Sequence, residues 1–189
     1  MRYHFLLPAL GLAAFAACSK EYPTTNLGLN AASVHLKGGA NAEPSFADNG
    51  INLSTSGELA GLGNGDVLVT LDAQANATST CTNQGGNQAP GQNPAPVDVS
   101  GAVSIPESEI KNGNTPFSVT TEDPVTPIPG APGCPNPNWT QDITDLSFTT
   151  ATITVEQPAG NLVLTVTCTF SGPTTNGAVA GADVTCTSS

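Results

Sequence analysis

Apolar and polar residues alternate along much of the chain, and the longest alternating stretch begins at residue 67. In GDVLVTLDAQANATSTC, the odd-numbered positions from 67 to 81 are apolar or small, and polar side chains take most of the even ones. A period of two is typical of a strand with one buried and one wet face. NLVLTVTCTF repeats the pattern, with Leu162, Leu164, Val166, Cys168 and Phe170 on one face.

Shorter strands are predicted at residues 97–105, 117–121, 143–155 and 178–186. The apolar phase switches between Phe148 and Ala151, which predicts a bulge or a break between two strands. Helix evidence is limited to one possible turn in residues 106–113. Many short strands separated by Gly- and Pro-rich connections predict an all-β fold, an antiparallel sandwich or a partly open barrel.

The first seventeen residues differ from the rest. Arg2 precedes an uncharged apolar run of about 13 residues, Phe5 to Ala17, whereas a membrane-spanning helix needs roughly 20. Small residues then lead to Cys18. This layout predicts a removable signal peptide, residues 1–17, and therefore export.

The signal ends in Phe15-Ala16-Ala17-Cys18, which resembles the lipobox of bacterial lipoproteins, although Phe15 replaces the usual aliphatic residue. The resemblance implies that Cys18 carries acyl chains such as palmitate and anchors the protein to a cell-envelope membrane. Residues 19–32 mix polar and small residues with a proline and show no clear period, so we expect residues 18–32 to tether a single β domain, residues 33–189. The alternative is cleavage after Ala14-Phe15-Ala16 and free secretion. Strings such as CPNPNWT resemble those of small exported β proteins of unknown function and imply no activity.

Cysteine usage favours the lipoprotein interpretation. If Cys18 is lipidated, Cys81, Cys134, Cys168 and Cys186 remain, an even number suited to two disulfides in an oxidising compartment. Four cysteines allow three pairings. A simple meander would bring the long connections 82–96 and 122–138 to the same end, so we expect a Cys81–Cys134 bond that ties them together and a Cys168–Cys186 bond.

Charge limits the partners. Without residues 1–17 the chain has three lysines against fifteen carboxylates, a net charge of −12. Nucleic-acid binding needs clustered Lys and Arg, and anionic lipid also attracts basic segments. We therefore expect no nucleic-acid partner, and membrane contact only through the lipid anchor.

Few residues suggest catalysis or a cofactor. His35 is the single histidine of the mature chain, and neither a nucleophile elbow, a zinc-ligand spacing nor an EF-hand accompanies it. We predict no metal site, no cofactor and no enzyme, with Ca²⁺ binding through loop oxygens left open. A glycosidase is the third hypothesis, since it needs two carboxylates; the neighbouring pairs are Glu107 with Glu109, Glu122 with Asp123, and Asp142 with Asp145.

Trp139 follows the second long connection and stands close to Cys134 in sequence. It either packs against the disulfide inside the fold or stacks on a sugar or protein partner. The leading hypothesis is a non-enzymatic extracytoplasmic lipoprotein with a surface-interaction or structural role. The alternative is a carbohydrate-binding module that uses Trp139 and the long loops.

Overall fold

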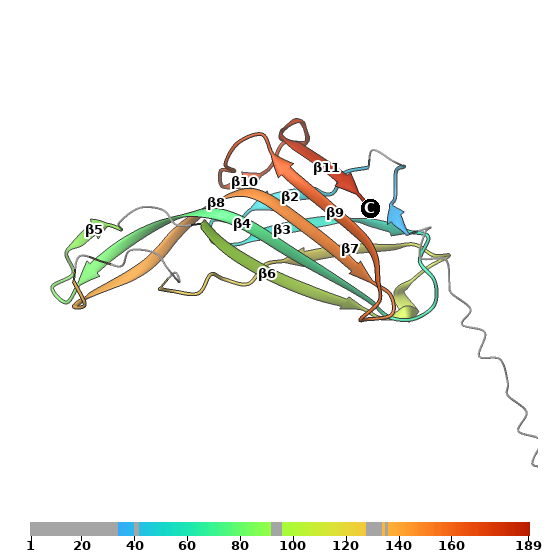
Figure 1. Cartoon of the computed structure of the whole chain (residues 1–189), viewed down its shortest axis with the longest axis horizontal. Helices are drawn as coiled ribbons and strands as arrows, with labels where there is room; N and C mark the ends of the chain where they lie inside the picture. The colour runs from blue at the N-terminus through green and yellow to red at the C-terminus, as the bar shows by residue number, and fades with distance from the viewer. Residues whose placement is uncertain (1–33, 40–41, 92–95, 128–133, 135) are drawn as a thin grey trace, which may run out of the picture.

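The computed structural model describes residues 34–39, 42–91, 96–127, 134 and 136–189. The signal peptide, the lipidation site Cys18 and the tether lie outside these residues. Eleven described strands form two antiparallel sheets that face one another as an open sandwich (Figure 1). The expected all-β class is confirmed, and of the two architectures the sandwich is the one observed.

The larger sheet is built around one long strand. β4 (Val67–Asn83) pairs with β8 (Trp139–Glu156) along one edge and with β6 (Pro96–Ile105) and β5 (Gln88–Pro90) along the other. β9 (Leu162–Phe170) and β11 (Val184–Ser188) extend the sheet beyond β8. From residue 67 to 77 the odd-numbered side chains of β4 are buried, as the alternation predicts.

The smaller sheet is built around β3 (Leu53–Ala60), a strand that the alternation did not predict. On one side it pairs with β1 (His35–Leu36) and β2 (Ser45–Asp48), and β2 pairs with β10 (Gly177–Ala178). β7 (Thr115–Thr120) lies on its other side. A short 3-10 helix, η3 (Gly181–Asp183), leads into β11.

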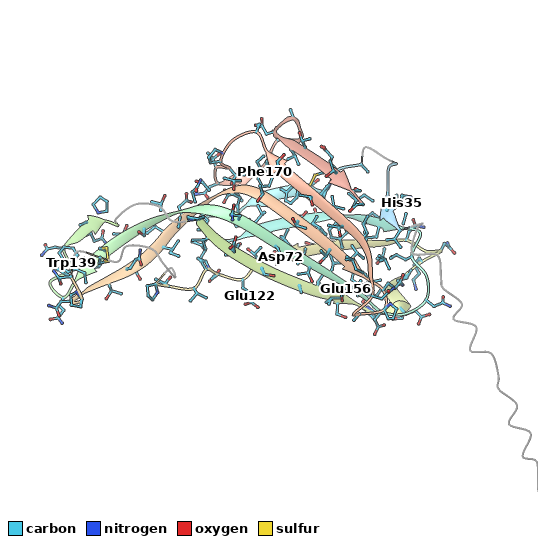
Figure 2. The ribbon with its side chains drawn as sticks, viewed as in Figure 1. His35, Asp72, Glu122, Trp139, Glu156 and Phe170 are labelled. Atoms are coloured by element: carbon cyan, nitrogen blue, oxygen red, sulfur yellow. A yellow bond between two sulfur atoms is a disulfide. The ribbon has the colours of Figure 1, made fainter. Side chains whose placement is uncertain are left out.

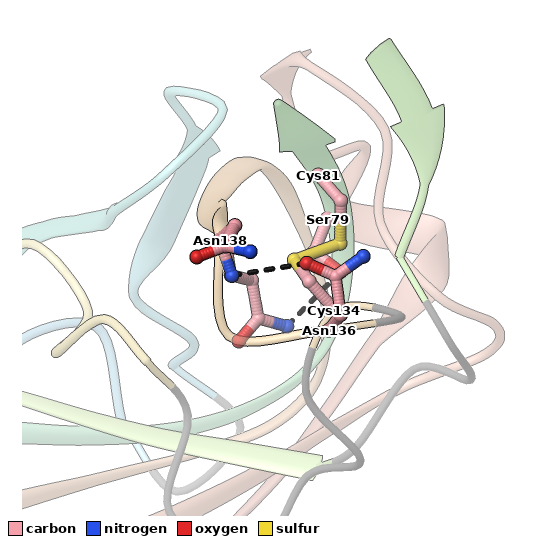
Figure 3. The surroundings of a disulfide bond; sticks show 6 residues. Ser79, Cys81, Cys134, Asn136 and Asn138 are labelled. Carbon is pink, nitrogen blue, oxygen red and sulfur yellow. Dashed lines mark hydrogen bonds between the residues drawn. A yellow bond between two sulfur atoms is a disulfide. The ribbon is translucent and has the colours of Figure 1, made fainter. Parts of the chain in front are cut away.

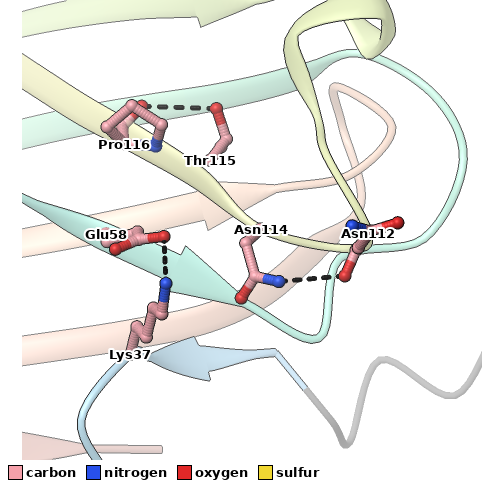
Figure 4. Close-up of polar contacts among 6 residues, drawn as sticks. All are labelled: Lys37, Glu58, Asn112, Asn114, Thr115 and Pro116. Carbon is pink, nitrogen blue, oxygen red and sulfur yellow. Dashed lines mark hydrogen bonds and ion pairs between the residues drawn. The ribbon is translucent and has the colours of Figure 1, made fainter.

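The simple meander expected through β4, β6 and β7 is wrong, because β7 pairs with β3 of the other sheet. After β6 the chain forms the 3-10 turn η2 (Glu107–Glu109) and then a tight turn with positive φ at Asn112 and Gly113. Figure 4 shows Asn114 Nδ2 donating to the Asn112 carbonyl in this turn at 2.9 Å. It also shows the exposed Lys37–Glu58 ion pair, 2.6 Å, between the end of β1 and β3.

Apolar side chains from both sheets fill the space between them. Leu53 and Leu59 of β3 and Leu71, Ile153 and Val155 of the larger sheet are fully buried. At one side of the sandwich, the rings of Phe46 and Phe170 meet edge to face with centroids 5.2 Å apart. This shared core makes the two sheets one packing unit.

The ribbon formed by β4 and β8 contains two bulges. Gln74 and Ala75 face Thr150 and Phe148, so Thr149 is an extra residue, and Thr144 is extra in the same way opposite Thr78 and Ser79. The hydroxyls of Thr149 and Thr144 each donate to a carbonyl of β4 at 3.2 Å. The phase switch at Phe148 is therefore a bulge inside one strand, and Figure 1 shows the ribbon curving along its length.

The predicted disulfide pairing is confirmed, because Cys81 bonds to Cys134 and Cys168 bonds to Cys186. Two disulfides in one domain indicate an oxidising, extracytoplasmic compartment. Within the described ranges, no helix has the length and apolar character needed to cross a membrane.

Candidate functional site

The β4–β8 ribbon extends past the smaller sheet and ends in a narrow tip. There Asn83, the last residue of β4, lies opposite Trp139, the first residue of β8, and β5 pairs alongside. Figure 2 shows Trp139 at this tip and His35, in the first described strand, near the opposite end of the molecule. The 17 residues of β4 alone span roughly 55 Å at the usual rise of a strand.

The Cys81–Cys134 disulfide lies at the tip (Figure 3). Its Cα atoms are 5.6 Å apart, and Cys81 is fully buried on the inner face of the ribbon. The bond joins β4 to the connection between β7 and β8 across 53 residues of sequence. In the chain-entropy model, closing a loop of that size stabilises the folded domain by about 4 kcal/mol, because it lowers the entropy of the unfolded chain. In the folded domain, the bond attaches this connection to the tip.

A compact turn sets the position of Trp139. The Asn138 amide donates to Asn136 Oδ1 at 3.0 Å, and the Trp139 amide donates to the Asn136 carbonyl at 3.2 Å (Figure 3 shows the first bond). Trp139 is half-buried and lies outside the core of the sandwich. The indole is therefore partly exposed at the tip and is not part of the sandwich core.

A groove of about 650 Å³ runs beside Trp139. Its walls come from both ends of the second long connection and from the start of β8. The lining residues are Thr126, Pro127, Cys134, Asn136, Pro137, Trp139, Thr140 and Gln141. Amides, hydroxyls, prolines, one indole and the disulfide-bonded Cys134 make up this lining, and none of these side chains carries a formal charge.

Gln141 is the residue of this groove that sequence reasoning missed. It is only 8 % exposed, pairs with Cys81 across β4 and β8, and donates from Nε2 to Ser79 Oγ at 3.3 Å. Its Oε1 is buried and has no hydrogen-bond partner among the described residues. The sequence did contain one indication of its position. Gln141 is two residues from Ile143, so both side chains lie on the inner face of β8, where Ile143 packs against the core.

Two further hollows lie elsewhere. One of about 450 Å³ lies on the outer face of the larger sheet, between Asp72, Gln74, Asp98, Thr150 and Thr152. Another of about 260 Å³ lies under the connection after β9, between Phe170 and Asp183. Gln74 Nε2 donates to Asp98 Oδ1 at 3.2 Å, so part of the polar lining of the first hollow is paired internally.

The residues considered for catalysis are spread over the surface. Glu107 and Glu109 lie in η2, Glu122 and Asp123 follow β7, and all four are exposed. Asp142 is exposed on β8, whereas Asp145 is partly buried, with one carboxylate oxygen, Oδ1, lacking a hydrogen-bond partner in the described structure. None of these carboxylates lines the three hollows.

A metal site has no structural support in the part of the chain that the structure describes. No three His, Cys, Asp or Glu side chains gather there in a way that could hold an ion. His35 is exposed on β1, and all four cysteines of the domain form disulfides. Asp48, from one of the Asn- and Asp-rich turns, is buried and bonded within the protein.

No protein-family model, curated protein or solved structure matches this chain. The tip, with its disulfide, half-buried indole and uncharged groove, is therefore the candidate site on structural grounds alone.

Proposed function

We propose that this protein is a non-enzymatic, lipid-anchored extracytoplasmic protein that presents the groove at its tip to a binding partner. The observation that carries the proposal is the position of the Trp139 groove, at the end of the molecule opposite His35. Residue 35 follows the proposed tether, so an anchor at Cys18 would attach to the end away from the groove. A domain held in this way points its recognition surface outward from the membrane.

The composition of the tip also supports binding. Tryptophan is among the residues that carry most of the energy at binding surfaces, because its large rigid ring loses little entropy when it is covered. A disulfide and a hydrogen-bonded turn hold Trp139 in place before any partner arrives. Such preorganisation lowers the entropic cost of binding.

The anchor is tested by expressing the full chain and its Cys18→Ser variant in a bacterial host and fractionating the cells. We expect the wild type in the membrane fraction, with an acylated N-terminal cysteine by mass spectrometry, and the variant in the soluble extracytoplasmic fraction. An unmodified N-terminus and a soluble wild type would show that the protein is freely secreted and not lipid-anchored.

The tip is tested with the full chain carrying Cys18→Ser, which removes the lipid. The protein is incubated with envelope and extracellular polymer from the producing organism, and the retained fraction is measured. We expect Trp139→Ala to reduce retention and Leu162→Ala, a matched truncation of an exposed apolar side chain that lies outside the groove, to leave it unchanged. Equal retention of the two variants would mean that the tip is not the binding surface.

A further inference from the structure

A regular array of threonines covers the outer face of the larger sheet, where β8, β9 and β11 lie side by side (Figure 1). Along each strand these threonines alternate with inward-facing residues. They are Thr150, Thr152 and Thr154 of β8, Thr165, Thr167 and Thr169 of β9, and Thr185 and Thr187 of β11. We call these eight residues the threonine array.

The register of the three strands aligns the threonines in rows across the sheet. From β8 through β9 to β11, the rows are Thr150, Thr169 and Thr185, then Thr152, Thr167 and Thr187, then Thr154 and Thr165. Ser189 and Thr165 exchange two backbone hydrogen bonds of 2.9 Å, so a hydroxyl residue also completes the third row. Neighbouring members are therefore about 6.7 Å apart along a strand and about 4.8 Å apart between strands.

The hydroxyls of the array are left to solvent. Elsewhere, Thr144 and Thr149 donate to carbonyls of β4, and Thr55 donates to a carbonyl of β2. None of the eight array hydroxyls forms a hydrogen bond with another group of the described protein. Each threonine thus offers a donor, an acceptor and a methyl group, and its branched side chain has few rotamers to lose on binding.

The charge distribution favours a neutral partner. The mature chain has a net charge of −12, but its acids lie outside the array. Asp72 of β4 pairs with Thr152 at one border, and Glu156 ends β8 at another. These carboxylates would repel an anionic polymer. An apolar partner would bury the hydroxyls without pairing them, which also opposes binding.

Ice is a neutral partner with a matching repeat. Every water molecule in ice both donates and accepts hydrogen bonds, and on the prism faces of the crystal the oxygen atoms repeat at spacings close to both distances of the array. We infer that the threonine array binds ice, with its hydroxyls bonding to waters of the crystal surface. Adjacent strands twist by roughly 20–25°, so the contact is confined to these three strands and centres on Thr167 of β9.

This inference goes beyond the proposed function, because the array lies on the sheet face and shares no residue with the groove at the tip. The test measures whether growing ice takes up the protein. The full chain with Cys18→Ser, which removes the lipid, is placed around a slowly growing ice hemisphere together with an inert protein. Growing ice excludes ordinary solutes. We expect this protein to be enriched in the ice relative to the inert one and to slow the recrystallisation of small ice crystals.

Variants assign the binding to the array. Thr167→Tyr places a bulky ring above the central row, so it should lower the protein's uptake into ice by at least about tenfold. Thr140→Tyr is the matched control, because Thr140 is also an exposed threonine, lies on β8 and is outside the array. It should be taken up as the wild type is, and so should Trp139→Ala. Tyrosine is well tolerated in strands, and circular dichroism checks that each variant is folded.

Two outcomes would overturn the inference. One is that the wild type is excluded from ice as the inert protein is. The other is that Thr167→Tyr and Thr140→Tyr have the same uptake, whether high or low, since the array would then not be the contact surface. Either result would leave the proposed partner of the tip unaffected, because Trp139→Ala tests that surface separately.

Discussion

Thr174 and Asp48 meet in the buried space between the two sheets, 126 residues apart in sequence. The hydroxyl of Thr174 donates to Asp48 Oδ2 at 2.5 Å and accepts from the Phe148 amide at 2.9 Å. Asp48 Oδ1 accepts from the Gly50 amide at 2.9 Å. One side chain therefore connects β2 of the smaller sheet to β8 of the larger one, next to the bulge at Thr149.

Thr174→Val should destabilise the domain by roughly 3 kcal/mol, because it removes the hydrogen-bond partner of Asp48 Oδ2 and of the Phe148 amide, while Asp48 Oδ1 keeps its bond from the Gly50 amide. Thr174→Ser keeps the hydroxyl and should cost about 1 kcal/mol. Urea denaturation of both variants measures the difference. Equal losses would mean that removing the hydroxyl costs no more than removing the methyl group, and would contradict this prediction.

Two buried glutamines should respond differently to the same substitution. Gln157 Oε1 accepts from the Gly63 amide at 2.8 Å, and its Nε2 donates to the Gly63 and Gly65 carbonyls at 2.9 Å each. Gln157→Met should therefore cost about 2–3 kcal/mol, whereas Gln141→Met should change the free energy of unfolding by less than about 1 kcal/mol. Thermal and urea unfolding test this, and a larger loss at Gln141 would indicate a structural role for that residue.

Removing either disulfide should lower stability, but only one of the two removals should change the fluorescence of Trp139. Replacing Cys81 and Cys134 by serine should lower stability by about 4 kcal/mol, and replacing Cys168 and Cys186, 18 residues apart, by about 3 kcal/mol. Only the first change should shift the emission of Trp139 to longer wavelength, because only that bond closes a wall of the groove. Identical spectra for the two double variants would contradict this assignment.

At Gly101, β6 of the larger sheet lies close to the end of β7 of the smaller sheet. A Cβ at this position would collide with the backbone of Thr120 and Thr121 at the end of β7, and the Glu122 amide donates to the Ser100 carbonyl alongside at 2.8 Å. Gly101→Ala should cost at least about 2 kcal/mol. Gly172→Ala is the matched control, since a Cβ there meets no atom within 4 Å and its stability should stay within about 1 kcal/mol.

Where alternation was strong, the sequence predicted the fold well. β4 and β9 follow the period-two stretches, and the phase switch after Phe148 located the bulge at Thr149. The cysteine pairing was also correct, although the meander behind it was not. Both long connections still reach the tip, because β4 leads out to it and the chain after β7 returns there to start β8.

β3 was missed for a physical reason. Its inward positions include Thr55, which is buried, and Gly57, whose missing side chain leaves room for the ring of Phe117 on β7. A strand does not show apolar alternation in its sequence when a neighbouring strand supplies part of the apolar surface on its inner face. The sequence also did not predict that Gln141 lines the groove. Nothing in a sequence distinguishes a glutamine whose amide is fully hydrogen-bonded from one whose amide is not.

The long β4–β8 ribbon also determines how the molecule bears mechanical load. If the His35 end is held and the Trp139 end is pulled, the tension runs along the strands. The backbone hydrogen bonds between β4 and β8 lie across that direction, so they are sheared together instead of being peeled apart one at a time. A pull on Trp139, at the start of β8, would therefore be shared by many bonds of this ladder before it passes through the apolar core to the smaller sheet that contains His35.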